Sequence, residues 1–271
     1  MAKKQPSKLT LLAFRFLEGV RAYGWIGIAI AVGFLAISAI SAREASHVET
    51  VDPVILPLAD GEALVTEEEL LARLAAGFTK PMSELALSDI DVKRVESVLE
   101  GQAFVASAEA YIDDDLQLNI IVTQRVPLLR IIAENGQNYY LDEDGVRMPL
   151  SDSYTARVPV VSGNVVLWSD DFMDHENNQL RQLVDLAHHF RNDPFLDALV
   201  EQIYLNTKGE LVLAPKVGDQ VIHLGHYHKT KTRERLRRLK NFYREGLPYE
   251  GWRKYKSFDL RFSDQVIARK R

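Results

Sequence analysis

The sequence contains no cysteine, so disulfide bonds and thiolate metal sites are excluded. This absence suits a bacterial periplasm and a cytosol equally well. Phosphate-binding loops, nucleophile elbows and glycine-rich dinucleotide motifs are also missing from the sequence. These absences agree with a protein that is not an enzyme. The sequence therefore predicts no catalytic residue, no cofactor and no small-molecule substrate.

The histidines and the acidic turns do not predict a metal site. His223, His226 and His228 lie in the string HLGHYHK, and a strand followed by a turn does not bring three imidazoles onto one face. Asp113-Asp114-Asp115 separates two strand-like segments and is typical of a solvated turn. We predict no bound metal ion.

Charged side chains are absent between Arg21 and Arg43. As a helix, residues 22–42 would be about 31 Å long, against about 30 Å for the hydrocarbon core of a bilayer. A cleaved signal peptide is the alternative, because the stretch ends in small residues, but the apolar regions of signal peptides span only about 7–15 residues. The sequence therefore predicts a retained transmembrane helix over 22–42.

The charge is distributed unevenly along the chain. Residues 1–21 carry five Lys or Arg against one Glu, which predicts a cytoplasmic tail and places the rest of the chain outside the membrane. Residues 43–228 carry 13 basic and 32 acidic side chains, and residues 229–271 carry 15 basic and 5 acidic ones. The basic helix expected over 229–245 could bind nucleic acid or anionic lipid, but a solvated face, or one that complements the acidic body or an acidic partner segment, is the favoured interpretation. We expect no nucleic acid there, because this part of the chain is predicted to lie outside the membrane.

A compact α+β unit is predicted after the apolar stretch. The sequence indicates a strand over 47–58, interrupted by Pro53 and so placed at a sheet edge. A capping box at Thr66–Glu69 starts a helix, and Ser88 or Asp89 starts a second one. Two strands follow over 104–112 and 116–125. This order, within about 75 residues, predicts one α+β unit of domain size.

A second, mostly antiparallel β-domain with two helices is predicted to begin near Val126. Asn135-Gly136 is a strong hairpin signal between two apolar segments. Amphipathic helices are expected over 174–191 and 229–245. Residues 256–268 are typical of one or two strands at the C-terminal end.

Three strings within this order resemble the FtsQ/DivIB family of bacterial cell-division proteins, most closely its Bacteroidetes type. They are QRVPLLRI at 124–131, YYLDEDGVRMPLS at 139–151 and YTARVPVVSG at 154–163. The resemblance implies a POTRA-like domain over 48–123 and a β-domain over 124–268. It further implies a non-enzymatic scaffold of the divisome in the bacterial inner membrane at the division site. That scaffold would link ring assembly to septal peptidoglycan synthesis.

The resemblance also implies partners and a place for them. The expected partners are small single-span coiled-coil proteins of the FtsB/DivIC and FtsL types, with other divisome membrane proteins and the lipid of the inner membrane. In the family the partner adds a strand to the end of the β-domain sheet, and the matching stretch is Ser257–Ser263. The predicted partner-binding residues are Phe258, Leu260, Arg261, Phe262 and Ser263.

The residues themselves agree with this mode of binding but leave an alternative open. A strand at a sheet edge has unpaired N–H and C=O groups that can pair with a partner strand. By alternation, Phe258, Leu260 and Phe262 share one face, and Asp259, Arg261 and Ser263 share the other. The alternative is an ordinary closing strand covered by its own domain.

A second class of function also fits a membrane-anchored POTRA-like unit. Such units appear in chaperones and translocation factors, which continue into further units or a barrel. This sequence contains one such unit, followed by a compact β-domain, so division is the favoured hypothesis.

Overall fold

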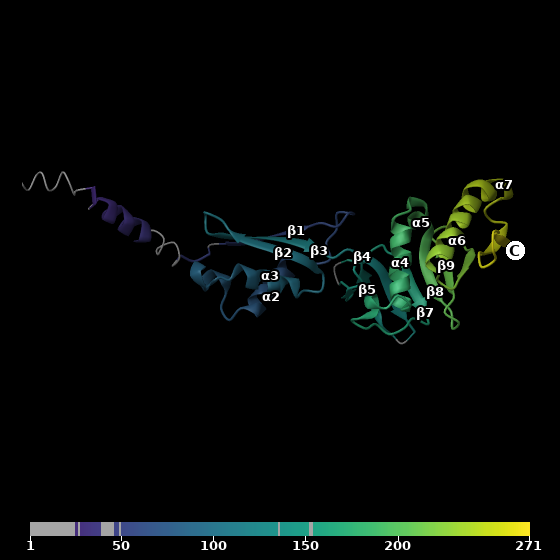
Figure 1. The fold of residues 1–271 in the computed structure, drawn as a ribbon, viewed down its shortest axis with the longest axis horizontal. Coiled ribbons are helices and arrows are strands. Elements are labelled where there is room, and N and C mark those ends of the chain that lie inside the picture. The colour runs from purple at the N-terminus through teal and green to yellow at the C-terminus, as the bar shows by residue number, and fades with distance from the viewer. Residues whose placement is uncertain (1–24, 27, 39–45, 49, 135, 152–153) are drawn as a thin grey trace, which may run out of the picture.

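The chain folds around two β-sheets, each with helices on one face (Figure 1). The computed structural model describes residues 25–26, 28–38, 46–48, 50–134, 136–151 and 154–271. Its two sheets contain three and nine strands, and the described part of the chain is α+β with mixed sheets.

The N-terminal prediction needs correction. Residues 22–24, 27 and 39–42 of the expected membrane span, and all of the expected tail 1–21, lie outside the described residues. The described helical residues are 25–26 and 28–38, and the longer run is only about 17 Å long at 1.5 Å per residue. In the described part of the chain, no helix is both long enough and apolar enough to cross a bilayer. For these residues the prediction of a transmembrane helix is wrong.

The small sheet has the order β1-β3-β2, with β1 parallel to β3 and β2 antiparallel to it. Its strands are β1 (Thr50–Leu56), β2 (Val105–Ile112) and β3 (Gln117–Gln124). Two helices, α2 (Glu67–Gly77) and α3 (Val92–Glu100), pack on one face of it (Figure 1). The chain order is strand, helix, helix, strand, strand.

Local sequence explains where these helices begin. Thr66 accepts from the Glu69 amide at 3.3 Å, and the Glu69 carboxylate accepts from the Thr66 amide at 2.9 Å, which completes the capping box. Asp91 caps α3 by accepting from the Lys93 amide at 3.0 Å. The second helix therefore starts later than Ser88 or Asp89, and Leu87–Asp89 forms a 3-10 turn instead.

The large sheet has the order β12-β11-β10-β9-β8-β7-β4-β5-β6. Its strands are β4 (Pro127–Ala133), β5 (Asn138–Asp142), β6 (Arg147–Met148), β7 (Val160–Gly163), β8 (Val200–Leu205), β9 (Leu211–Pro215), β10 (Val221–Gly225), β11 (Tyr255–Asp259) and β12 (Ile267–Lys270). Its helices are α4 (Gln179–Arg191), α5 (Pro194–Leu199), α6 (Lys229–Asn241) and α7 (Leu247–Glu250), with a π-helical turn at Phe242–Gly246. Buried residues of α4 to α7 share one apolar core with the sheet.

Five of the eight strand pairs described in this sheet are antiparallel, as expected, but the sheet is mixed and has more helices than the two expected. The pairs β4–β7, β7–β8 and β10–β11 are parallel, and four α-helices accompany the sheet. Parallel neighbours need long crossover connections, and here α4 and α5 connect β7 to β8 while α6 connects β10 to β11. The hairpin signals in the sequence identify antiparallel pairs only.

The two sheets meet at β5 and β6. Tyr139 belongs to the core of the large sheet, whereas Tyr140 and Met148 belong to the core of the small sheet. Adjacent residues of a strand point to opposite faces, so β5 contributes to both cores. A salt bridge of 3.0 Å between Arg125 and Asp142 lies at the same junction. The β6 end of the large sheet is thus packed against the small unit.

Candidate partner-binding edge

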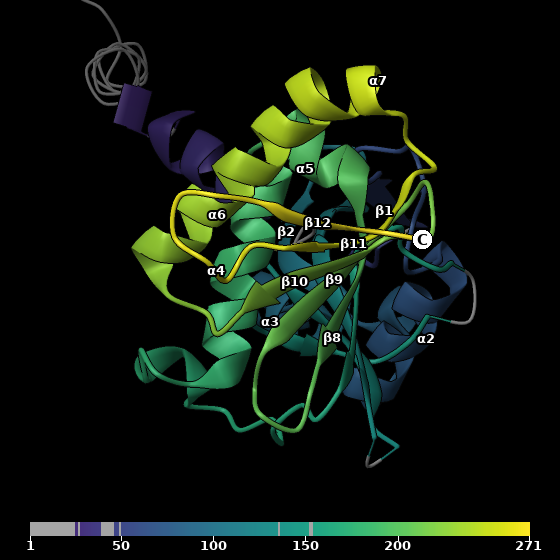
Figure 2. The same cartoon turned by 90° about the vertical axis from the view of Figure 1, so that its right-hand side faces the viewer.

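The far end of the large sheet is built by β10, β11 and β12 (Figure 2). β11 lies between β10, to which it is parallel, and β12, to which it is antiparallel. β12 is therefore the edge strand, and β11 has neighbours on both sides. The predicted binding stretch Ser257–Ser263 covers the end of β11 and the loop that follows, and it does not include β12.

The two edges of this sheet have different surroundings. At the β6 edge, Met148 is fully buried in the core of the small unit. At the β12 edge, Ile267 and Ala268 are half-buried, and Arg269 and Lys270 are exposed. An open edge strand presents unpaired backbone donors and acceptors to its surroundings.

The register shows which backbone groups of β12 point outward. The Arg271 amide donates to the Lys254 carbonyl at 3.2 Å, so it points toward β11. The pairing of β11 with β12 contains a bulge between Tyr255 and Ser257, and the extra residue belongs to β11. The backbone groups of β12 therefore still alternate regularly between the β11 side and the outer side. The N–H and C=O groups of Lys270 and Ala268 therefore point away from the sheet.

Phe258 and Leu260 lie in the core rather than on the surface. Both are 0% exposed. The Phe258 ring packs edge-on against Phe242 and Tyr243, with centroid distances of 5.2 and 5.7 Å. These contacts hold β11, the neighbour of β12, against the π-helical turn that follows α6.

Phe262 and Ser263 lie in the exposed loop between β11 and β12. Phe262 is 48% exposed, although alternation places it on the same face as Phe258 and Leu260. The alternation ends because β11 ends at Asp259. Asp264 follows with a positive φ of 59°, which turns the chain back toward β12.

Arg261 is held by two carboxylates of its own chain. Its Nε and Nη2 atoms donate to the two oxygens of Asp259 at 3.0 and 2.7 Å, and its Nη1 donates to Glu210 at 3.2 Å. The guanidinium holds the pKa of the buried Asp259 carboxyl below its ordinary value. Arg261 thus joins the end of β11 to the turn between β8 and β9, and its side chain remains 39% exposed.

Arginines of the basic helix α6 hold the same region from the other side. Arg238 donates to the carbonyls of Leu260 and Phe262 at 3.2 and 3.1 Å. Arg235 donates to the carbonyls of Leu224 at 2.9 Å and of His226 at 3.1 Å. These bonds satisfy carbonyls at the ends of β10 and β11, so part of the charge of α6 has a structural role.

The sequence reasoning did not identify β12 as a separate binding element. A usable signal was present, because Ser263-Asp264-Gln265 is a polar turn between two apolar segments. The segment predicted as one or two strands over 256–268 is in fact a hairpin of β11 and β12.

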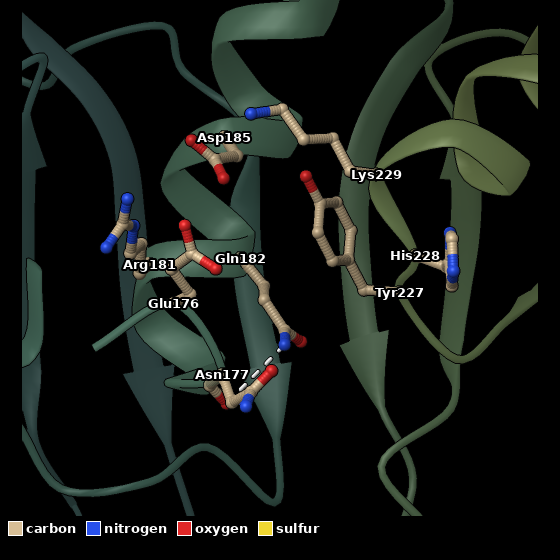
Figure 3. A pocket seen from close by; sticks show the side chains of 8 residues that line it. All are labelled: Glu176, Asn177, Arg181, Gln182, Asp185, Tyr227, His228 and Lys229. Carbon is tan, nitrogen blue, oxygen red and sulfur yellow. Dashed lines mark hydrogen bonds between the residues drawn. The ribbon is translucent and has the colours of Figure 1, made fainter.

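A separate polar hollow of about 330 Å³ lies between α4 and the start of α6 (Figure 3). Asp185 and Tyr227 approach each other there, and burial, followed by the charge of Asp185, raises the pKa of the Tyr227 hydroxyl. His228 lies apart from the other labelled side chains (Figure 3). The described residues contain no group of three or more His, Cys, Asp or Glu side chains placed to hold a metal ion.

Comparison with known proteins points to one family. The family model described as FtsQ/DivIB, C-terminal related, matches residues 126–269, which include all of the nine-stranded sheet except Lys270, the last residue of β12. A protein named Cell division protein FtsQ, from Salinibacter ruber (strain DSM 13855 / M31), is 29% identical over 169 residues. That alignment covers 57% of this chain and 60% of the relative, so the matched region spans less than two thirds of the relative's length.

Proposed function

The chain belongs to the FtsQ/DivIB family of cell-division proteins, and from this premise we propose that it is a non-enzymatic scaffold of the divisome. It acts at the division site, where it recruits small coiled-coil proteins of the FtsB/DivIC and FtsL types. It thereby links ring assembly to septal peptidoglycan synthesis. The family match favours this role over that of a translocation factor.

The open β12 edge is the observation that supports the proposal. A partner segment adds a strand to β12 and pairs with the outward N–H and C=O groups of Ala268 and Lys270. Backbone pairing of this kind gives affinity, and side chains at alternate positions give selectivity. At the other edge, the Met148 side chain is buried in the core of the small unit.

The predicted binding residues have different roles in this proposal. Phe258 and Leu260 do not contact the partner. They are buried in the core, where they hold β11 in place beside the edge strand β12. Phe262 and Ser263 are exposed beside β12 and contact the partner directly. Arg261 fixes the base of this loop and presents the remaining exposed part of its guanidinium to the partner.

The exposed charges next to the edge indicate the chemistry of the partner strand. Arg269 and Lys270 are exposed on β12, and Arg271 follows directly. Opposite charges across neighbouring strands stabilise a pair, and like charges destabilise it. An extended segment with acidic side chains therefore fits β12 best.

A proline at Ala268 tests strand addition. Ala268→Pro removes an outward N–H and places a ring where the partner backbone would lie, without removing a β11–β12 hydrogen bond. We expect the full-length variant to bind the FtsB/DivIC-type protein of the same bacterium about tenfold more weakly or worse, since a net hydrogen bond contributes about 0.5–1.5 kcal/mol and the ring adds a clash. Isothermal titration calorimetry measures this change.

Ala268→Ser is the matched control, because serine keeps the backbone N–H and is close in size to alanine. Ala268 is half-buried, and the small change of side chain should alter the affinity by no more than about twofold, or about 0.5 kcal/mol. Equal affinity of the proline variant, with its fold intact by circular dichroism, would refute strand addition at β12. In cells, depletion should cause filamentation, whereas a loss of outer-membrane proteins would support translocation instead.

A further inference from the structure

A second hollow, of about 620 Å³, opens at one end of the strands β10, β11 and β12. Its walls come from the segment before β10, the segment before β11 and the residue after β12, through Val217, Asp219, Trp252, Arg253 and Arg271. The hollow therefore lies directly beyond the C-terminal end of the open edge strand. Its size falls within the range of about 300–1,000 Å³ typical of pockets that bury a small ligand.

Large apolar side chains are exposed around this hollow. Of the residues that line it, Val217 is 79% exposed and Trp252 is 51% exposed. Contiguous apolar exposure that polar groups border is typical of a protein-binding site.

The walls are held in place by contacts within the chain. The Trp252 ring packs edge-on against Tyr243 at a centroid distance of 5.7 Å. The Trp252 carbonyl accepts from the buried Gln220 side chain at 2.9 Å. On the opposite rim, Arg271 forms a salt bridge with Asp219 and donates to the Arg253 carbonyl at 3.0 Å. A preformed pocket of this kind binds at a lower entropic cost than a mobile surface.

We propose that this hollow receives one large apolar side chain from the same acidic segment that adds to β12. The inference rests on the proposed strand addition. An added strand lies about 4.8 Å from β12 and advances about 3.3 Å per residue. A residue just beyond its paired part therefore reaches across Arg271 to Val217 and Trp252.

Charge supports this occupant over a second copy of the chain. The rim and the adjoining edge carry Arg253, Lys254, Arg269, Lys270 and Arg271, of which Lys254 is paired with Glu250 and Arg271 with Asp219. A second copy would bring its own basic edge against this one, which like-charge repulsion disfavours. An acidic segment with an apolar anchor meets both features of the surface.

The test compares exposed apolar residues at the two ends of the sheet. Val217→Ser in the full-length protein should weaken binding of the FtsB/DivIC-type protein about fivefold to tenfold, as expected when a valine loses part of its burial. Leu167→Ser is the matched control, because Leu167 is also an exposed apolar residue, with 65% exposure. It follows β7, whose last residue Gly163 pairs with Leu205 at the end of the strands that is opposite to the hollow. Leu167→Ser should leave the affinity within about twofold. Trp252→Ala should weaken binding more than Val217→Ser, but it also removes a contact with Tyr243.

Photo-crosslinking separates the possible outcomes. A photoreactive amino acid at position 217 should crosslink to the same partner as one at position 269, within about ten residues along the partner chain, given about 3.3 Å per residue. If Ala268→Pro abolishes binding while Val217→Ser binds normally, the hollow is not part of the interface and strand addition stands. If neither variant changes the affinity, the proposed function itself fails at this edge. A crosslink from position 217 to a second copy of the chain would overturn the inference.

Discussion

Replacing Arg261 with glutamine tests whether the ion pair at the base of the edge loop stabilises the fold independently of any partner. Arg261 gives the Asp259 carboxylate two charged hydrogen bonds, of 2.7 and 3.0 Å, and the Asp259 side chain is only 3% exposed. Hydrogen bonds to charged groups contribute about 1.5–3 kcal/mol each. Because the guanidinium is 39% exposed, solvent screening reduces the total for the two bonds below their simple sum of about 3–6 kcal/mol, and we expect about 2 kcal/mol.

The pH dependence of this variant follows from the pKa of Asp259. Arg261 lowers that pKa in the folded protein from its ordinary value of 3.8. A depressed folded-state pKa stabilises the fold above the unfolded pKa, and this stability is lost as the pH falls through the folded pKa. The difference between the original protein and Arg261→Gln should therefore be largest at neutral pH and shrink below about pH 4, near the unfolded pKa of an aspartate.

Thermal and urea unfolding measure the effect. A loss of about 2 kcal/mol lowers Tm by about 4–8 °C for a domain of this size. Glu210→Gln is the control. The Glu210 carboxylate also accepts a hydrogen bond of 2.9 Å from Asn206, which a glutamine oxygen can keep, so this variant should lose less than about 1 kcal/mol of stability. A double-mutant cycle with Asp259→Asn should give a coupling free energy of about 1–3 kcal/mol. A coupling near zero, or an unchanged difference at pH 3, would refute the reasoning.

Two further predictions concern the cores of the two units. Phe258→Ala should lower the free energy of unfolding by about 3–5 kcal/mol, because it empties a fully buried site among Phe242, Tyr243 and Tyr255; a urea transition with an unchanged midpoint would contradict this. Thr66→Ala should cost about 1 kcal/mol by removing the cap of α2, whereas Thr66→Ser should restore most of it; equal Tm values for the two variants would argue against the capping box.

Local signals in the sequence predicted several elements of the small unit correctly. The capping box at Thr66–Glu69 and the alternation in 116–125 each depend on neighbouring residues, and both features are present in α2 and β3. The start of α3 was placed too early, because Ser88, Asp89 and Asp91 are all good caps and only packing selects Asp91. The division at residue 123/124 remains a prediction, and Tyr140 and Met148 contribute to the core on the other side of it.

The order of strands in the large sheet was beyond reach of the sequence patterns. β10 and β11 are neighbours although α6 separates them in sequence, and their parallel pairing depends on how α6 packs. The sequence also could not show that β12 is the edge strand, because Ser257–Ser263 and Ile267–Lys270 are both short and partly apolar. At residues 22–42 the sequence pattern predicted too much. Hydropathy alone predicted a membrane span there, and the described helical residues do not support it.

The basic character of the last part of the chain has more than one physical role. Arg235 and Arg238 hold carbonyls at the ends of β10 and β11, so their charges serve the fold. Arg269 and Lys270 lie on the open edge, where two copies meeting through β12 would bring cations opposite each other. Exposed edge strands invite unwanted pairing, and lysine and arginine on the edge oppose it. The same two charges attract an acidic strand, so β12 can stay open to such a partner while resisting association with itself.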